Sequence, residues 1–219
     1  MMKVKYFKHE LKSIEKLYED SNSKDLRGKF KHCLKVAFRA MEICKLVELP
    51  YTPAIELACL LHDVGLRDGR KGHHLNGVKY LKSFIKDNGI SLNDDDYYSV
   101  IMAINQHRKG YKPPLDGFFP LISQIVSAAD TELMDKPEEE AYNVITDKLI
   151  GYLLEDNKDI HTVYKEVYAF LKKLYGKDGV VYNNPLIKLY KEETFSKLIE
   201  DKLKSDLKSK VKKAFKERK

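Results

Sequence analysis

The sequence contains little cysteine and no long apolar run. Its 219 residues include only Cys33, Cys44 and Cys59, and these form no CxxC pair. We therefore expect no disulfide framework, and interpret the three as packed thiols in a reducing compartment. No apolar run approaches the roughly 18 residues that a membrane span needs. The opening residues, MMKVKYFKHELK, lack a signal-peptide core. We expect a cytoplasmic protein with no membrane partner.

Surplus positive charge is scarce outside one segment. The formal net charge is +7, and residues 191–219 hold eleven Lys and Arg against six Asp and Glu. Because most of the excess lies in this tail, it is weak support for nucleic-acid binding by the rest of the chain. We expect no nucleic-acid partner. The pattern says nothing about oligomeric state.

The chain also lacks a period-2 strand pattern, internal repeats and low-complexity linkers, whereas apolar residues recur at helical spacing. Pro, Gly and Asn-Gly separate these segments. The predicted helices cover about residues 6–20, 30–48, 53–64, 73–88, 94–108, 120–134, 136–155, 160–175 and 192–217. The helix over 136–155 is expected to start at Asp135-Lys136-Pro137-Glu138, with Asp135 as its cap. We expect an all-α fold in four parts: a packed N-terminal helix (1–27), a core (28–135), additional helices that complete the domain (136–190) and a basic helical tail (191–219).

Six possible metal ligands occupy similar places on the predicted helices of the core. His62 and Asp63 end an apolar run, and the others are His32, His73, His107 and Asp130. At 100° per residue, five of them lie on the apolar side of five different helices: His32, His62, His73, His107 and Asp130. One such histidine is more often a hydrogen-bonded core residue. Several imidazoles and carboxylates directed into one core would be strongly destabilising without divalent cations to compensate. Mixed imidazole and carboxylate ligands suit Mn, Fe, Co, Ni or Zn.

These residues carry a family resemblance over about residues 28–135. The order His32, His62-Asp63, Asp130 resembles that of the HD-domain superfamily of metal-dependent phosphohydrolases, and LLHDVG matches its core motif. The segments HHLNG (residues 73–77) and QHRKG (residues 106–110) resemble the extra histidines of the subset that binds two metals. The resemblance implies an HD-domain-like helical bundle with a C-terminal helical extension.

The resemblance also implies roles for individual residues. The first metal would be held by His32, His62, Asp63 and Asp130, and Asp63 would bridge to a second metal held by His73 and His107. We favour His73 over His74 because its four-residue spacing to Gly77 fits the family pattern. Some two-metal members have a histidine where this chain has Gln106, so the second metal would have fewer protein ligands.

A second departure concerns substrate binding. Many members have a Lys where this chain has Leu66, so contacts to a substrate phosphate would come from other basic residues beside the ligands. The candidates are Arg67, Arg70, Lys71, Arg108 and Lys109. Each of them can equally be a solvated loop charge.

Two divalent transition metals can activate a shared hydroxide for in-line attack on phosphorus, with Asp63 fixing their spacing. We therefore expect a metal-dependent phosphohydrolase that cleaves a phosphate ester or anhydride bond. The substrate that we expect is a small phosphorylated compound, and a small nucleotide before other classes. Two alternatives stay open. One is a non-haem di-iron oxygenase with the same ligand set, and the other is an HD-type regulatory or binding module with a structural metal.

Overall fold

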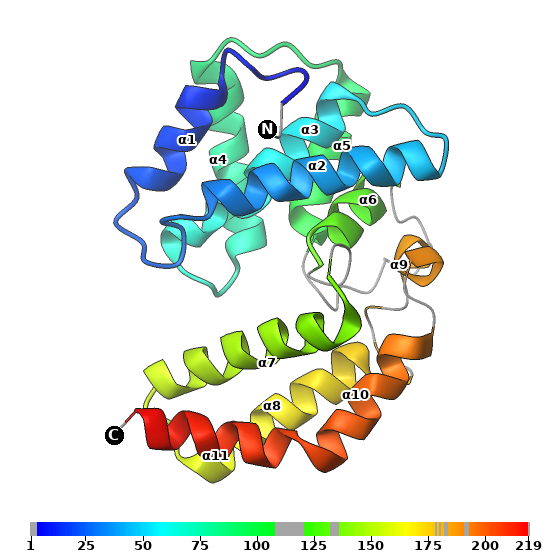
Figure 1. The fold of residues 1–219 in the computed structure, drawn as a ribbon. Coiled ribbons are helices and arrows are strands. Elements are labelled where there is room, and N and C mark those ends of the chain that lie inside the picture. Colours follow the sequence, from blue (N-terminus) through cyan, green and yellow to red (C-terminus); the bar gives the residue numbers. More distant parts are fainter. Residues whose placement is uncertain are drawn as a thin grey trace. The chain divides into compact units, whose positions relative to one another are not determined.

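Figure 1 shows the chain as a computed structural model, which describes residues 4–107, 121–131, 136–177, 179, 181, 184–190 and 193–218. Within these ranges the regular structure is helical throughout and no strand occurs, which confirms the all-α prediction. The chain divides into two compact units, Met1–Asp130 and Thr131–Lys219. None of the helices in the described ranges combines the length and apolar character needed to cross a bilayer. The four-part division stays a prediction.

The first unit is built around a helix that is buried on all sides. Every residue of α3 (Pro53–Leu61) after its first is buried, and α3 contacts α2 (Phe30–Leu46), α5 (Asp94–Gln106) and α6 (Leu121–Ala129). A helix that is buried on every face needs such neighbours. Its start is fixed locally, because the Thr52 side chain accepts the Ile55 N–H at 3.3 Å and Pro53 occupies the first turn.

The chain turns tightly after α3. The sequence predicted a helix to about residue 64, but α3 ends at Leu61, and Val64–Asp68 forms a short 3-10 helix, η1. The next helix, α4 (His73–Asp87), packs on η1 and on α5. A Cβ atom on Gly65 would lie 1.8 Å from the carbonyl oxygen of His73. The absence of a side chain at Gly65 therefore permits the contact between η1 and α4.

The predicted first helix is too long at its start. It was expected from about residue 6, whereas α1 covers Leu11–Glu19. The backbone N–H groups of Lys5, Tyr6 and Phe7 donate to the buried carboxylate of Glu56 at 2.8, 2.7 and 2.9 Å. These bonds hold the segment against α3. A single carboxylate thus satisfies three backbone donors at once, which local helix propensity does not reveal.

The second unit is organised around α8 (Ile160–Tyr175), which contacts α7 (Glu138–Glu155), α10 (Glu193–Ser205) and α11 (Leu207–Glu217). The rings of Tyr175 and Phe195 meet edge to face, with centroids 5.7 Å apart. The tail was expected as one helix, but it is broken at Asp206, where φ is −115°. The short helix α9 (Pro185–Tyr190) was not predicted.

The basic tail pairs with acidic side chains of its own unit. Lys202 bonds to Glu139, and Lys210 bonds to Asp147. Both carboxylates belong to α7, whose first turn consists of Glu138, Glu139 and Glu140. The positive charge concentrated in the last thirty residues of the sequence is thus partly balanced inside the second unit.

Candidate metal centre

The six predicted ligands all come from ends of helices in the first unit. His32 lies in the first turn of α2, and His73 is the first residue of α4. The other four directly follow helices: His62 and Asp63 follow α3, His107 follows α5, and Asp130 follows α6. Their ligand atoms form two groups of three, within 4.8 Å of one another in each group: His32, His62 and Asp130, and Asp63, His73 and His107.

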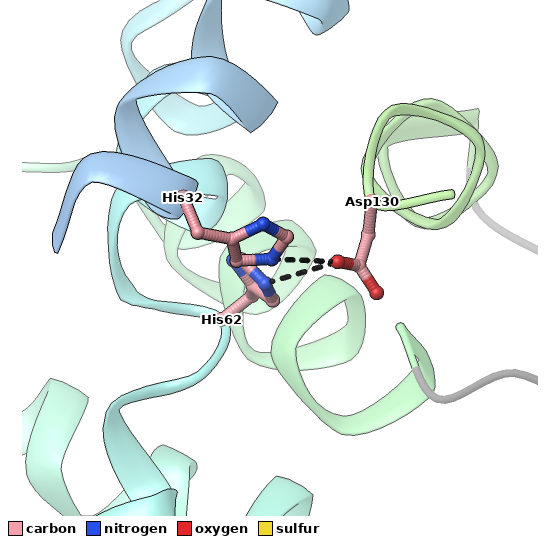
Figure 2. A group of neighbouring side chains, drawn as sticks. All are labelled: His32, His62 and Asp130. Carbon is pink, nitrogen blue, oxygen red and sulfur yellow. Dashed lines mark hydrogen bonds and ion pairs between the residues drawn. The ribbon is translucent and has the colours of Figure 1, made fainter. Parts of the chain in front are cut away.

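The first group is arranged around the carboxylate of Asp130, as Figure 2 shows. The Oδ1 atom of Asp130 is 2.9 Å from His32 Nε2 and 3.5 Å from His62 Nε2. The side chain of His62 is fully buried, whereas His32 and Asp130 retain some exposure. Two imidazole nitrogens therefore converge on one carboxylate at the edge of the core.

The second group brings two histidine rings together edge to face beside Asp63. The Nε2 atoms of His73 and His107 are 3.2 Å apart. The Oδ1 atom of Asp63 lies 3.8 Å from His73 Nε2 and 3.7 Å from His107 Nε2. These three side chains come from three different helix ends.

Asp63 lies between the two groups. While its Oδ1 atom faces His73 and His107, its Oδ2 atom faces the first group, at 3.6 Å from His62 Nε2 and 3.9 Å from His32 Nε2. The two oxygens of one carboxylate thus point toward two sets of imidazoles. This is the arrangement that a carboxylate needs to bind two cations at once.

Backbone carbonyls orient three of the four imidazoles. The Nδ1 atoms of His62, His73 and His107 contact the carbonyl oxygens of Cys59, Arg70 and Ile104 at 2.8, 2.9 and 2.6 Å. A carbonyl oxygen only accepts, so Nδ1 carries the proton and, in the neutral ring, Nε2 keeps its lone pair. Metal-binding histidines are typically oriented in this way.

This orientation provides a test of whether the residues fit a metal. In their neutral forms His73 and His107 direct two Nε2 lone pairs at each other across 3.2 Å, which is repulsive without a cation. Nitrogens bound to one ion at roughly 2.1 Å lie about 3.0–3.4 Å apart. In the first group, His62 Nε2 is buried without a hydrogen bond of ordinary length. The donor set therefore fits divalent transition metals.

Electrostatics support the same interpretation. Burial lowers the pKa of His32 and His73, so both imidazoles are neutral at neutral pH, as metal ligands must be. Burial would raise the pKa of Asp63, but the charges of His62 and Lys29 outweigh it and hold that pKa well below its usual range. Burial would lower the pKa of His62, but the charge of Asp63 raises it. Without metal, a proton on His62 balances the carboxylate.

Three of the five residues predicted to bind phosphate lie in the described part of the chain. The Arg70 guanidinium pairs with Asp25 at 2.6 Å, and the Arg67 guanidinium lies 5.7 Å from the centre of the Tyr80 ring. Lys71 is exposed, and Leu66 is buried. Arg108 and Lys109 lie outside the described residues. The roles of all five basic residues in substrate binding stay predictions.

Two further positions bear on the site. The ring of His74 lies 5.8 Å from that of His73, and among the described residues His73, not His74, belongs to the second group. Lys29 was not among the predicted site residues, but its Nζ atom lies 3.3 Å from Asp63 Oδ2. Its position three residues before His32 was a usable signal, because residues i and i+3 share a helix face.

Comparisons with known proteins place this geometry in a family. A family model for the HD domain matches residues 30–135, the segment that includes all six candidate ligands. Neither the comparison with curated proteins nor that with solved structures gave a match. HD domains bind divalent metals, and the family consists generally of metal-dependent phosphohydrolases. Residues 30–135 of this chain thus match the HD-domain family, as the order of the candidate ligands predicted.

Proposed function

We propose that the protein is a phosphohydrolase with two divalent transition metals. His32, His62 and Asp130 would hold one metal, His73 and His107 the other, and Asp63 would bind both. The observation that carries this proposal is the position of Asp63, whose Oδ2 and Oδ1 atoms face different pairs of imidazoles. A structural metal would need only one such set.

The chemistry follows from the metals and from the residues that position them. Two divalent metals about 3.5–4 Å apart lower the pKa of water and neutralise charge on a transferring phosphoryl group. The carboxylate of Asp63 fixes the spacing of the two sites. The carbonyl oxygens of Cys59, Arg70 and Ile104 keep His62, His73 and His107 in the required tautomer.

The substrate that we propose is a small phosphorylated compound, cleaved at an ester or anhydride bond. Solvent reaches the centre on the side of His32, Asp130 and His73, whose side chains are 15–19% exposed, whereas His62 and His107 form its buried floor. A phosphoryl group can approach from that open side. Nucleotides are the first class to screen.

Metal analysis tests the ligand set. The full chain, purified without added metal, should contain about two equivalents of transition metal, and Asp63→Ala should lose both. Asp95→Ala is a matched control, because Asp95 is an exposed carboxylate in the first turn of α5. One tightly held metal that survives Asp63→Ala would contradict the two-metal proposal and favour a structural site.

Activity measurements separate hydrolysis from the oxygenase alternative. We expect the metal-free protein, reloaded with Mn²⁺ or Co²⁺ under anaerobic conditions, to release phosphate or a phosphorylated product from a nucleotide panel. Asp63→Ala should abolish this release, and Asp95→Ala should not. Consumption of O₂ with an organic substrate by the iron-loaded protein, without phosphate release in the anaerobic assay, would refute hydrolysis.

A further inference from the structure

Lys29 lies beside the candidate metal centre. It directly precedes α2 and follows Gly28, whose φ of +79° turns the chain at this point. The Lys29 Nζ atom is 3.3 Å from Asp63 Oδ2. The side chain of Lys29 is 23% exposed, against 10% for Asp63, so the lysine approaches the carboxylate from the solvent side.

The oxygen that Lys29 contacts is the one that faces the first metal group. Of the two Asp63 carboxylate oxygens, Oδ2 is the one that lies near His62 Nε2 and His32 Nε2, at 3.6 and 3.9 Å. A divalent cation in that group would bind this oxygen and repel an ammonium group beside it. Lys29 has a flexible four-carbon stem and three N–H donors, so it can move from the carboxylate to another anion nearby.

The charges at the loaded centre indicate what that anion is. Among the described residues, the charged groups named at the centre are Lys29 and the carboxylates of Asp63 and Asp130, so two divalent cations would give a formal surplus of three positive charges. A phosphoryl group brings two negative charges, and an activated water brings a third. We propose that Lys29 binds a phosphoryl oxygen of the substrate at the first metal position, an inference that rests on the proposed function.

The competing explanation is that Lys29 serves only to neutralise Asp63. In that case its removal would disturb the metal ligand itself, and the metal content would fall. If Lys29 binds substrate instead, its removal leaves the metals in place or strengthens their binding, because a cation that competes for Asp63 Oδ2 is gone. Metal content and phosphate affinity therefore separate the two roles.

The experiment compares Lys29→Ala, Lys29→Arg and the control Lys31→Ala in the full chain loaded with Mn²⁺. Lys31 is an exposed lysine two residues further along, on α2. The probe is inorganic phosphate, with its affinity measured by calorimetry. We expect Lys29→Ala to weaken phosphate binding roughly tenfold to a hundredfold, as for a lost charge-assisted hydrogen bond. Lys29→Arg should retain most of the affinity, and Lys31→Ala all of it.

Three results would overturn the proposal. They are an unchanged phosphate affinity in Lys29→Ala, a metal content that falls in that variant, and an equal loss of phosphate affinity in Lys31→Ala. With a cleaved substrate in hand, Lys29→Ala should raise KM more than it lowers kcat. If the wild-type protein holds two metals and cleaves the substrate while Lys29→Ala binds phosphate normally, this inference fails alone. If the wild-type protein neither holds two metals nor binds phosphate, the proposed function fails with it.

Discussion

In the proposed two-metal centre, replacing Gly65 with alanine should displace His73, a ligand of the second site, and leave the ligands of the first site in place. The added Cβ atom would lie 1.8 Å from the His73 carbonyl oxygen and 2.4 Å from the Gly77 nitrogen, whereas ordinary contacts begin at 3.4 Å. Backbone atoms of α4 must therefore move by about 1.6 Å relative to η1. His73 is the first residue of α4. A metal ligand tolerates displacements of only about 0.2 Å, so the second site should lose its metal.

The same displacement costs stability. Overpacking typically costs about 1–3 kcal/mol, and a backbone clash of this size falls at the upper end. For a domain of this size, about 3 kcal/mol corresponds to a Tm lower by roughly 6–12 °C. The assays are metal content by mass spectrometry and thermal unfolding by circular dichroism.

Two glycines provide graded controls for this substitution. A Cβ atom on Gly77 would lie 2.9 Å from the side-chain Cγ2 atom of Ile104, with the backbone atoms Gly65 N and His62 O at ordinary contact distances of 3.7 and 3.8 Å. A Cβ atom on Gly151 meets nothing within 4 Å. Gly77→Ala should therefore have a smaller effect, and Gly151→Ala, inside α7, should not destabilise the protein. If Gly65→Ala retained two metals and an unchanged Tm, the reasoning about close approach would be refuted.

Three further predictions concern the parts that support the site and the second unit. Glu56→Gln replaces the acceptor of three backbone N–H groups and should lower the free energy of unfolding by about 2–4 kcal/mol. Denaturant unfolding measures this loss, and the backbone amides of residues 5–7 should exchange faster. Unaltered exchange at these amides would contradict the prediction. Phe195→Ala should lower the free energy of unfolding by about 3–5 kcal/mol and expose the tail to protease, because Phe195 is fully buried against Tyr175. The control is Phe170→Ala, because Phe170 is partly exposed. Equal protease resistance in both variants would contradict the packing argument. Asp159 is the cap of α8, and the side-chain hydrogen bond from Thr162 lowers its pKa. The contribution of Asp159 to stability is therefore present above its unfolded-state pKa and is lost as the pH falls through its lowered folded-state pKa. Asp159→Asn should flatten this part of the acid unfolding profile, and a profile identical to wild type would exclude the effect.

Helical periodicity predicted most of the helices because their apolar faces are set by residues three and four apart. The starts of α2, α3, α4, α5 and α8 fall at the predicted residues. The errors lie where distant groups decide the structure. The carboxylate of Glu56, about fifty residues further along the chain, accepts hydrogen bonds from the N–H groups of residues 5–7. The break at Asp206 occurs without a Pro or Gly that would have predicted it.

The candidate centre was predictable for a related reason. A helix end has a fixed direction, so ligand residues at equivalent ends can be expected to converge once the helices pack together. The position of Lys29 one turn before His32 indicates the side on which it lies, but its contact with Asp63 depends on the rotamer of a long flexible side chain and not on backbone register. The pairing of Lys202 and Lys210 with α7 likewise depends on packing within the second unit.

Because one carboxylate serves both histidine clusters, the two halves of the centre cannot be independent. An ion that takes Oδ2 of Asp63 fixes the rotation of the whole carboxylate, and with it the position of Oδ1 beside His73 and His107. The first ion thereby removes freedom that the second would otherwise have to restrain. Titration with metal should consequently be cooperative, with few molecules holding a single ion at intermediate occupancy.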